Sequence, residues 1–161
     1  MRITQTHVYF WDGPFSQWYC KPDHSTLFSV GNLDFKTAEH YMMFHKADLF
    51  NDTDIATKIL ETNHPKDIKA LGRLVKNFDK SIWDQHCDEI VKQGNLLKFS
   101  QNPDLLTLIK THSDKTFVEA SPYDSIWGVG IHERDDLILD ESNWKGLNKL
   151  GKALTTVAQL L

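Results

Sequence analysis

Apolar and polar residues recur along most of this chain at helical spacing. Five segments are predicted to be helices on this pattern: 38–50, 54–61, 65–75, 81–99 and 103–111. A last helix near the C-terminus has an apolar stripe formed by Leu147, Leu150, Gly151, Leu154, Val157, Ala158 and Leu161. Three shorter runs have strand composition: 7–11, 27–30 and 117–120. The pattern predicts an α+β, mainly helical fold, a single compact domain of residues 1–161 with a few short N-terminal and central strands.

Residues at the predicted helix ends support these boundaries. Thr37 is expected to cap the helix that starts at Ala38, and Glu39 lies in its first turn, where a negative charge suits the helix dipole. Pro65 and Pro103 fit the first position of their helices. The segment 81–99 is predicted to face the core with Trp83, Cys87, Ile90, Val91, Gly94 and Leu97.

The helix predicted at 38–50 is apolar around most of its circumference, so it is expected to be largely buried. Glu39 and Lys46 are the polar residues that need an explanation there. Seven residues is close to two turns, so both side chains leave nearly the same face, about 10 Å apart along the axis. Burial is expected to raise the pKa of a glutamate and lower that of a lysine, which suits acid–base and amine chemistry. The alternative is that Glu39 only favours the helix dipole while Lys46 extends to water.

Composition narrows the class of protein. Hydrophobic residues make up 40% and charged residues 25% of the 161-residue chain, ordinary values for a soluble domain. The net charge of -4 argues against a protein that holds duplex DNA by electrostatics alone. Cys20 and Cys87 form no C-x-x-C pair, which favours a reducing compartment. The sequence contains no run of 18 apolar residues that would predict a membrane span. We therefore expect a cytoplasmic protein, or a nuclear one in a eukaryote.

Several familiar sites have no support in the sequence. His40 and His45 are five residues apart and do not share a helix face, so no metal site is predicted. The run Gly128-Val129-Gly130 lacks the third glycine of a dinucleotide fingerprint. Neither a Walker A sequence nor a G-x-S-x-G elbow occurs. No cofactor is predicted.

Aromatic loops provide a second candidate surface. Trp11, Trp18, Tyr123 and Trp127 lie in segments of loop composition, where large aromatics either fold into the core or stack against a base or sugar. Arg73 and Lys145 could neutralise phosphate. The backbone N–H groups of residues 146–148, at the start of the last helix, could bind an anion.

Five sequence elements in order resemble the NADAR (YbiA-like) superfamily. The segment Thr37-Ala38-Glu39-His40-Tyr41 with Lys46 resembles its T-[AS]-E-H-Y-x4-K signature. The other four similar elements are Phe15-Ser16-Gln17-Trp18, Leu71-Gly72-Arg73, the loop from Tyr123 to Gly130 containing W-G-V-G, and Gly146-Leu147-Asn148-Lys149-Leu150-Gly151. The resemblance runs from about Val8 to the C-terminus, and Gln17 departs from it because asparagine is usual there.

The resemblance implies an N-glycosidase that cleaves the bond between ribose carbon 1 and an exocyclic base amine. ADP-ribose on guanine in DNA is the first expected substrate, carried on a single-stranded or locally unpaired strand. The alternative is a phosphorylated ribosylamino-pyrimidine of riboflavin synthesis. Glu39 and Lys46 are the implied catalytic residues. The implied substrate-binding residues are Ser16, Gln17, Trp18, Arg73, Asp124, Trp127, Gly128, Lys145 and Asn148.

Two mechanisms and two rival functions stay open at this point. An unprotonated Lys46 could form a Schiff base with the ring-opened ribose while Glu39 moves protons. Alternatively, Glu39 activates water for direct hydrolysis and Lys46 only orients oxygen atoms. The same pocket could also serve a non-catalytic ADP-ribose reader, although a reader has little use for a carboxylate near the anomeric carbon. A module whose aromatic loops bind another protein is the third reading.

Overall fold

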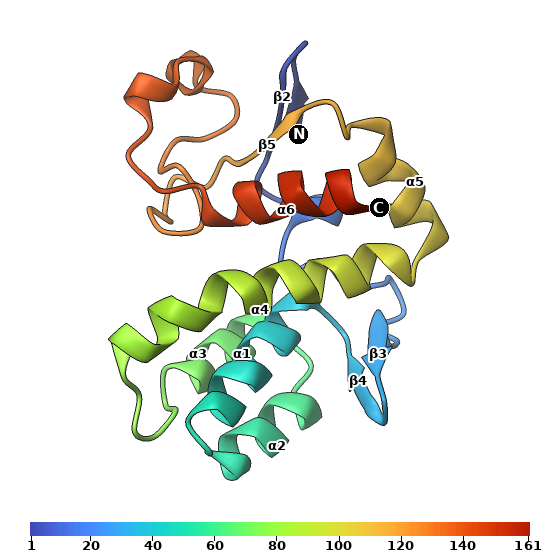
Figure 1. Ribbon diagram of the computed structural model, residues 1–161, viewed down its shortest axis with the longest axis vertical. Coiled ribbons are helices and arrows are strands. Elements are labelled where there is room, and N and C mark those ends of the chain that lie inside the picture. The colour runs from blue at the N-terminus through green and yellow to red at the C-terminus, as the bar shows by residue number, and fades with distance from the viewer. The chain divides into compact units, whose positions relative to one another are not determined.

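The computed structural model describes all of residues 1–161, and these form two compact units. The central unit is Gln17–Asn102, and the terminal unit combines Met1–Ser16 with Pro103–Leu161. The elements of both units are drawn in Figure 1. The fold is α+β and mainly helical, with a few short strands, as the hydrophobic pattern predicts. A single domain over residues 1–161 stays a prediction.

The central unit is built around one buried helix. Its elements are β3 (Phe28–Val30), β4 (Leu33–Phe35), α1 (Ala38–Leu49), α2 (Thr53–Glu61), α3 (Pro65–Gly72) and α4 (Lys80–Ser100). Helix α1 contacts α2, α3 and α4, and Figure 1 shows it beside all three. All six residues from Ala38 to Met43 are buried, which confirms the prediction of a largely buried helix.

The first turn of α1 is held at His40, by the Thr37 side chain on one side of the ring and the Thr62 backbone carbonyl on the other. Thr37 caps the helix as predicted, because its Oγ1 accepts the His40 N–H at 3.2 Å. The His40 ring lies 2.7 Å from Thr37 Oγ1 through Nδ1 and 2.8 Å from the Thr62 carbonyl through Nε2. Burial lowers the pKa of His40, so the ring favours the neutral form. His40 therefore links α1 to the residue after α2.

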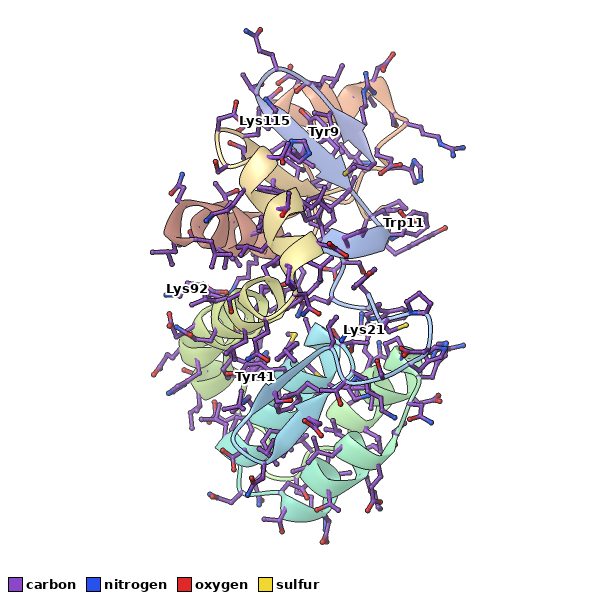
Figure 2. The ribbon with its side chains drawn as sticks, turned by 90° about the vertical axis from the view of Figure 1, so that its right-hand side faces the viewer. Tyr9, Trp11, Lys21, Tyr41, Lys92 and Lys115 are labelled. Carbon is purple, nitrogen blue, oxygen red and sulfur yellow. The ribbon has the colours of Figure 1, made fainter.

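Two glycines let the neighbouring helices approach α1 closely. A Cβ at Gly94 of α4 would lie 2.7 Å from Cδ1 of Tyr41, and one at Gly72 of α3 would lie 2.1 Å from Sδ of Met43. The Tyr41 ring also packs on Phe28 and Phe35 of the β3–β4 hairpin, with centroids 5.8 Å and 5.1 Å away. Figure 2 labels Tyr41 next to this hairpin. The ring at Gly94 consequently has little room to move aside.

The buried face of α4 differs from the predicted one. The structure buries Cys87, Val91 and Gly94 as expected, together with Asn95, Lys98 and Phe99. Trp83, Ile90 and Leu97 are only half-buried. The apolar stripe alone could not reveal this rotation, because the partner surface offers polar groups and aromatic rings to Asn95 and Lys98.

Lys98 is more deeply buried than any other lysine, arginine, aspartate or glutamate of the central unit, and its side chain is fully covered. Its Nζ lies 5.0 Å from the centre of the Phe99 ring and 5.5 Å from that of Tyr19. Burial lowers the pKa of Lys98 to about 7. The lysine is thus close to half-charged at neutral pH in the folded chain, while the unfolded chain keeps it charged.

The terminal unit pairs a three-stranded sheet with a helix that covers its edge. Its elements are β1 (Arg2–Ile3), β2 (His7–Phe10), α5 (Pro103–Thr111), β5 (Thr116–Glu119), α6 (Lys149–Leu160) and three short 3-10 turns at Gly13–Phe15, Asp136–Leu139 and Glu141–Asn143. The strand order is β1-β2-β5, with β1 antiparallel and β5 parallel to β2. Val8 pairs with Phe117 in this register. Figure 1 shows α6 alongside β5.

Two side chains, of Thr155 in α6 and of Asn148 just before the helix, satisfy the open edge of β5. Thr155 Oγ1 accepts the Phe117 N–H at 3.0 Å. Asn148 accepts the Glu119 N–H through Oδ1 and donates to the Phe117 carbonyl through Nδ2, both at 3.0 Å. A Cβ at Gly151 would lie 2.2 Å from that same carbonyl, so the helix fits only with glycine there. The edge strand is thereby covered rather than left open to another chain.

Other boundaries also differ in part from those predicted. Helix α3 ends at Gly72, not at residue 75, and strands β1 and β4 were not expected. Trp11 lies beyond the end of β2, and Leu147 precedes α6 and is 56% exposed instead of lying on its apolar stripe. Short strands and helix ends depend on hydrogen-bond partners far along the chain, which local periodicity does not contain.

The close contact between Gly94 and Tyr41 predicts the effect of a single methyl group. Gly94→Ala is expected to lower the free energy of unfolding by about 1–3 kcal/mol, because the overpacked ring cannot move aside. Urea unfolding measures the change. The exposed face of α4 supplies the matched control Gln85→Ala, for which near-neutral stability is expected. A stabilised Gly94→Ala protein would mean that helix propensity outweighs the contact.

Burial of Lys98 predicts a pH dependence of stability. The folded chain loses this proton near pH 7 and the unfolded chain near pH 10.5, so between these values the unfolded chain binds more protons. The free energy of unfolding should therefore rise from pH 7 to pH 9, by up to about 1.4 kcal/mol per pH unit from this group. Lys98→Met should remove that rise, and Lys80→Met, at an exposed position, should keep it. Equal slopes in wild type and Lys98→Met would contradict the assignment.

Candidate active site

Glu39 and Lys46 both lie on α1, two turns apart. Glu39 is the second residue of the helix and is only 5% exposed, and its backbone N–H donates to the Gln17 carbonyl at 3.0 Å. Lys46 is half-buried near the other end of the helix. The Glu39 carboxylate acts electrostatically on the Lys46 amine. The two groups therefore belong to one local field, as their spacing predicts.

The surroundings of Lys46 favour its neutral amine. Its Nζ lies 4.5 Å from the centre of the Phe78 ring and 5.7 Å from that of Trp83. Burial lowers the pKa of Lys46; the Glu39 carboxylate opposes the shift and the Arg73 guanidinium adds to it. The direction agrees with the expectation from the sequence. A neutral amine is the form that can attack an electrophilic carbon.

Arg73 completes the charged groups at this end of the central unit. It follows Gly72 as the residue that ends α3, and its side chain is exposed. The lack of a Cβ at Gly72 lets α3 contact Met43 of α1, and this contact sets where Arg73 starts. An exposed guanidinium beside a lysine can accept a phosphate group, so the structure brings together Glu39, Lys46 and Arg73.

The loop before α1 contains two more predicted residues of the central unit. Gln17 is 8% exposed and its side-chain amide bonds inside the protein, to Asn95 at 2.8 Å and Met42 Sδ at 3.9 Å. Trp18, the next residue, is 42% exposed. Ser16 belongs to the terminal unit, where its N–H donates to the Gly13 carbonyl at 3.0 Å. Substrate contacts by these residues stay predictions.

The loop after β5 gathers three predicted residues of the terminal unit. Asp124 Oδ1 accepts the N–H groups of Ile126 at 2.9 Å and Trp127 at 2.8 Å, which fixes the turn. Gly128 follows, where a Cβ would lie 2.9 Å from the Glu119 carbonyl. Trp127 is half-buried, with the Lys149 Nζ 5.7 Å from its ring centre. One face of this loop is thus an aromatic ring beside a cation.

Asn148 and Lys145 lie against the same loop. The Asn148 amide is used at both ends by β5, as described above, and a Cβ at Gly130 would lie 3.1 Å from that of Lys145. Lys145 has an exposed side chain, and its N–H donates to the Val129 carbonyl at 2.9 Å. Asn148 therefore has a structural task, and its contact with substrate stays a prediction.

The expected anion site on backbone N–H groups at the start of α6 is wrong for Leu147 and Asn148. Leu147 donates to the Ser125 carbonyl at 3.0 Å and Asn148 to the Gly128 carbonyl at 3.1 Å. The next two N–H groups, of Lys149 and Leu150, donate to loop carbonyls as well. A helix start binds anions only when its N–H groups are available, and here the loop carbonyls occupy them.

Sequence reasoning missed four residues of these groups. Phe78 and Trp83 flank the Lys46 amine, Asn95 bonds to Gln17, and Lys149 lies over Trp127. Trp83 carried a signal, as a large aromatic at the start of a long helix, but it was assigned to the core. Asn95 is a polar residue within an apolar stripe, which is a sign of a buried hydrogen bond.

The structure offers no residue cluster for a metal site and no helix for a membrane span. No group of three or more histidine, cysteine, aspartate or glutamate side chains lies close enough to hold a metal ion. Cys20 and Cys87 are free thiols. None of the helices combines the length and apolar composition needed to cross a membrane.

Comparisons with known proteins define the class. The NMR structure of the Escherichia coli protein YbiA matches 99% of this chain and 86% of its own, with a TM-score of 0.75 and 22% identity, so the two share a fold. N-glycosidase R617 of Acanthamoeba polyphaga mimivirus is 44% identical over 145 residues, covering 90% of this chain and 85% of its own. The fold is thus that of the YbiA-like proteins.

The family follows from further matches. N-glycosidase Npun_R5314 of Nostoc punctiforme is 32% identical over 76% of this chain and 72% of its own. Protein irg-1 of Caenorhabditis elegans is 41% identical over 80% of this chain, which spans 62% of that protein. The model of the NADAR domain matches residues 9–161. The chain belongs to the NADAR domain family.

Proposed function

We propose that the protein is an N-glycosidase, a hydrolase acting on N-glycosyl bonds. Relatives from a mimivirus, a cyanobacterium and Escherichia coli carry the name N-glycosidase, and the first two are 44% and 32% identical to this chain. The observation that carries the chemistry is the Lys46 amine, whose pKa burial lowers, on the same helix as the buried Glu39. A base and a nucleophile in one field suit cleavage at an anomeric carbon.

The substrate we propose is ADP-ribose joined through ribose carbon 1 to an exocyclic amine of guanine in DNA. The net charge of -4 disfavours long-range attraction to duplex DNA, which favours a single-stranded or unpaired nucleotide. Arg73 would take a phosphate and Trp18 would stack against a base or sugar. On the terminal unit, the same roles fall to Lys145 and Trp127.

The proposed mechanism uses the exocyclic bond. A ribosylamine can open its ring to an imine, and the neutral Lys46 amine then attacks carbon 1 and displaces the base amine. The sugar is held as a Schiff base until water attacks the same carbon and releases it as free ADP-ribose. Glu39 delivers a proton to the departing amine and later removes one from the water. One water is consumed in total, and the enzyme returns to its first state.

Replacing the Glu39 carboxylate should abolish turnover without unfolding the protein. Glu39→Gln is expected to reduce release of ADP-ribose at least about 100-fold, because an amide cannot transfer protons. The substrate is a single-stranded oligonucleotide with one ADP-ribosylated guanine, and mass spectrometry follows free ADP-ribose. Glu61→Gln, an exposed carboxylate on α2, is the matched control and should keep full activity. Equal activity in Glu39→Gln and wild type would remove Glu39 from the mechanism.

A second substrate arm separates the two candidate activities. A phosphorylated ribosylamino-pyrimidine is offered to the same proteins, and release of the free pyrimidine is measured. Turnover of this compound alone would assign the protein to riboflavin intermediates. Calorimetric binding of ADP-ribose, with neither substrate consumed, would instead indicate a reader.

Borohydride reduction tests the role of Lys46. Added during turnover, it should convert the Schiff base into a stable secondary amine, seen as a sugar mass increase on the peptide containing Lys46. Lys46→Met should show no adduct and no turnover. Lys80→Met removes an exposed lysine and should show the same adduct as wild type. An active wild-type enzyme that forms no adduct would favour direct hydrolysis with Glu39 activating the water.

A further inference from the structure

A pair of buried amides connects α4 to the start of α1. Asn95, with a fully buried side chain, donates from Nδ2 to Gln17 Oε1 at 2.8 Å and to the Val91 carbonyl at 2.9 Å. Gln17 is itself buried. The Asn95 Oδ1 atom is buried and has no hydrogen-bond partner in the protein. A buried acceptor without a donor costs stability. The asparagine at position 95 is therefore not there for stability alone.

Gln17 in turn contacts two successive turns of α1. Its backbone carbonyl accepts the N–H of Glu39 at 3.0 Å, and its side-chain Nε2 lies 3.9 Å from Sδ of Met42. Residues 39 and 42 are three apart and so lie on neighbouring parts of one helix face. A residue that contacts both of them restrains the rotation of α1 about its axis. That rotation decides where the Glu39 carboxylate points.

The packing of α4 against α1 makes this arrangement possible. Gly94 comes directly before Asn95, and its missing side chain lets α4 approach Tyr41 of α1. The approach places Asn95 within reach of the loop that precedes α1. The first turn is also restrained at His40, by the Thr37 cap and by the Thr62 carbonyl, and neither of these hydrogen bonds involves Gln17.

We propose that Asn95 is a positioning residue for Glu39, acting through Gln17. Asn95 fixes the Gln17 amide, and the Gln17 carbonyl fixes the first turn of α1 with the carboxylate toward Lys46. This inference rests on the proposed function, in which Glu39 moves protons. It also gives Gln17 a role different from the substrate contact expected from the sequence: its side chain points into the protein and holds the helix.

Exchanging the two side-chain lengths tests the proposal. Gln17→Asn shortens one partner by a methylene, and Asn95→Gln lengthens the other, so each single variant breaks the 2.8 Å contact and the double variant can restore it. Each single variant should lose about tenfold in kcat, with KM within about twofold, because a displaced catalytic group affects the transition state and not substrate binding. The double variant should recover to within about threefold of wild type.

The assay uses the oligonucleotide with one ADP-ribosylated guanine, and the phosphorylated ribosylamino-pyrimidine in parallel. Gln85→Asn shortens an exposed amide on the same helix and is the matched control, with wild-type kcat expected. Thermal melts establish that each variant is folded. Asn95→Leu, close in size and apolar, replaces Asn95→Gln as the single variant if the longer side chain does not fit.

Two results would overturn the proposal. Folded single variants with unchanged kcat would show that Glu39 needs no support from the amides. A Gln17→Asn variant that raises KM, with no rescue by Asn95→Gln, would make Gln17 a direct substrate contact.

Failure of the proposed function is a separate outcome, since wild type would then turn over neither compound. Hydrogen exchange of the Glu39 amide still decides the present proposal in that case. Exchange should be faster in Asn95→Leu and return to the wild-type rate in the double exchange variant. Equal exchange rates in wild type and Asn95→Leu would contradict it without any activity measurement.

Discussion

Burial of α1 is the constraint on which the central unit depends. Three helices contact it, and two of them approach as closely as they do because glycine stands at positions 72 and 94. An almost fully covered helix has places for charged side chains only near its ends, where Glu39 is buried and Lys46 is half-buried. Glu39 and Lys46 occupy those places, so the packing that stabilises the unit also determines the spacing of the two groups.

Burial also lowers the pKa of two lysines in this unit. Lys46 is held against Phe78 and Trp83, where the loss of solvation favours its neutral amine. Lys98, deeper in the unit, shows the larger effect of full burial on a lysine. The two lysines differ in how far solvent or a ligand can reach them, because Lys46 is only half-buried and Lys98 is fully covered. Partial burial, with the Arg73 guanidinium nearby, lowers the pKa of the Lys46 amine and still leaves it accessible.

In the terminal unit, several residues of the family motifs have structural roles. Asn148 and Gly151 let α6 cover the edge of β5, while Asp124 and Gly128 form the turn that meets the start of the helix. The carbonyls of this loop take the first N–H groups of α6. These contacts explain the residue types at those positions without a ligand, and they leave Trp127, Lys145 and Lys149 as the groups that can meet one.

The sequence by itself determined the helices, the buried character of α1, its Thr37 cap, and the pairing of Glu39 with Lys46, because these depend on periodicity and on neighbours within two turns. The motifs in order also determined the family. Only the tertiary structure decided that Asn95 and Lys98 face inward, that Gln17 bonds to Asn95, and that the start of α6 is occupied by loop carbonyls. Each of these depends on partners distant in sequence, whose positions local patterns do not contain.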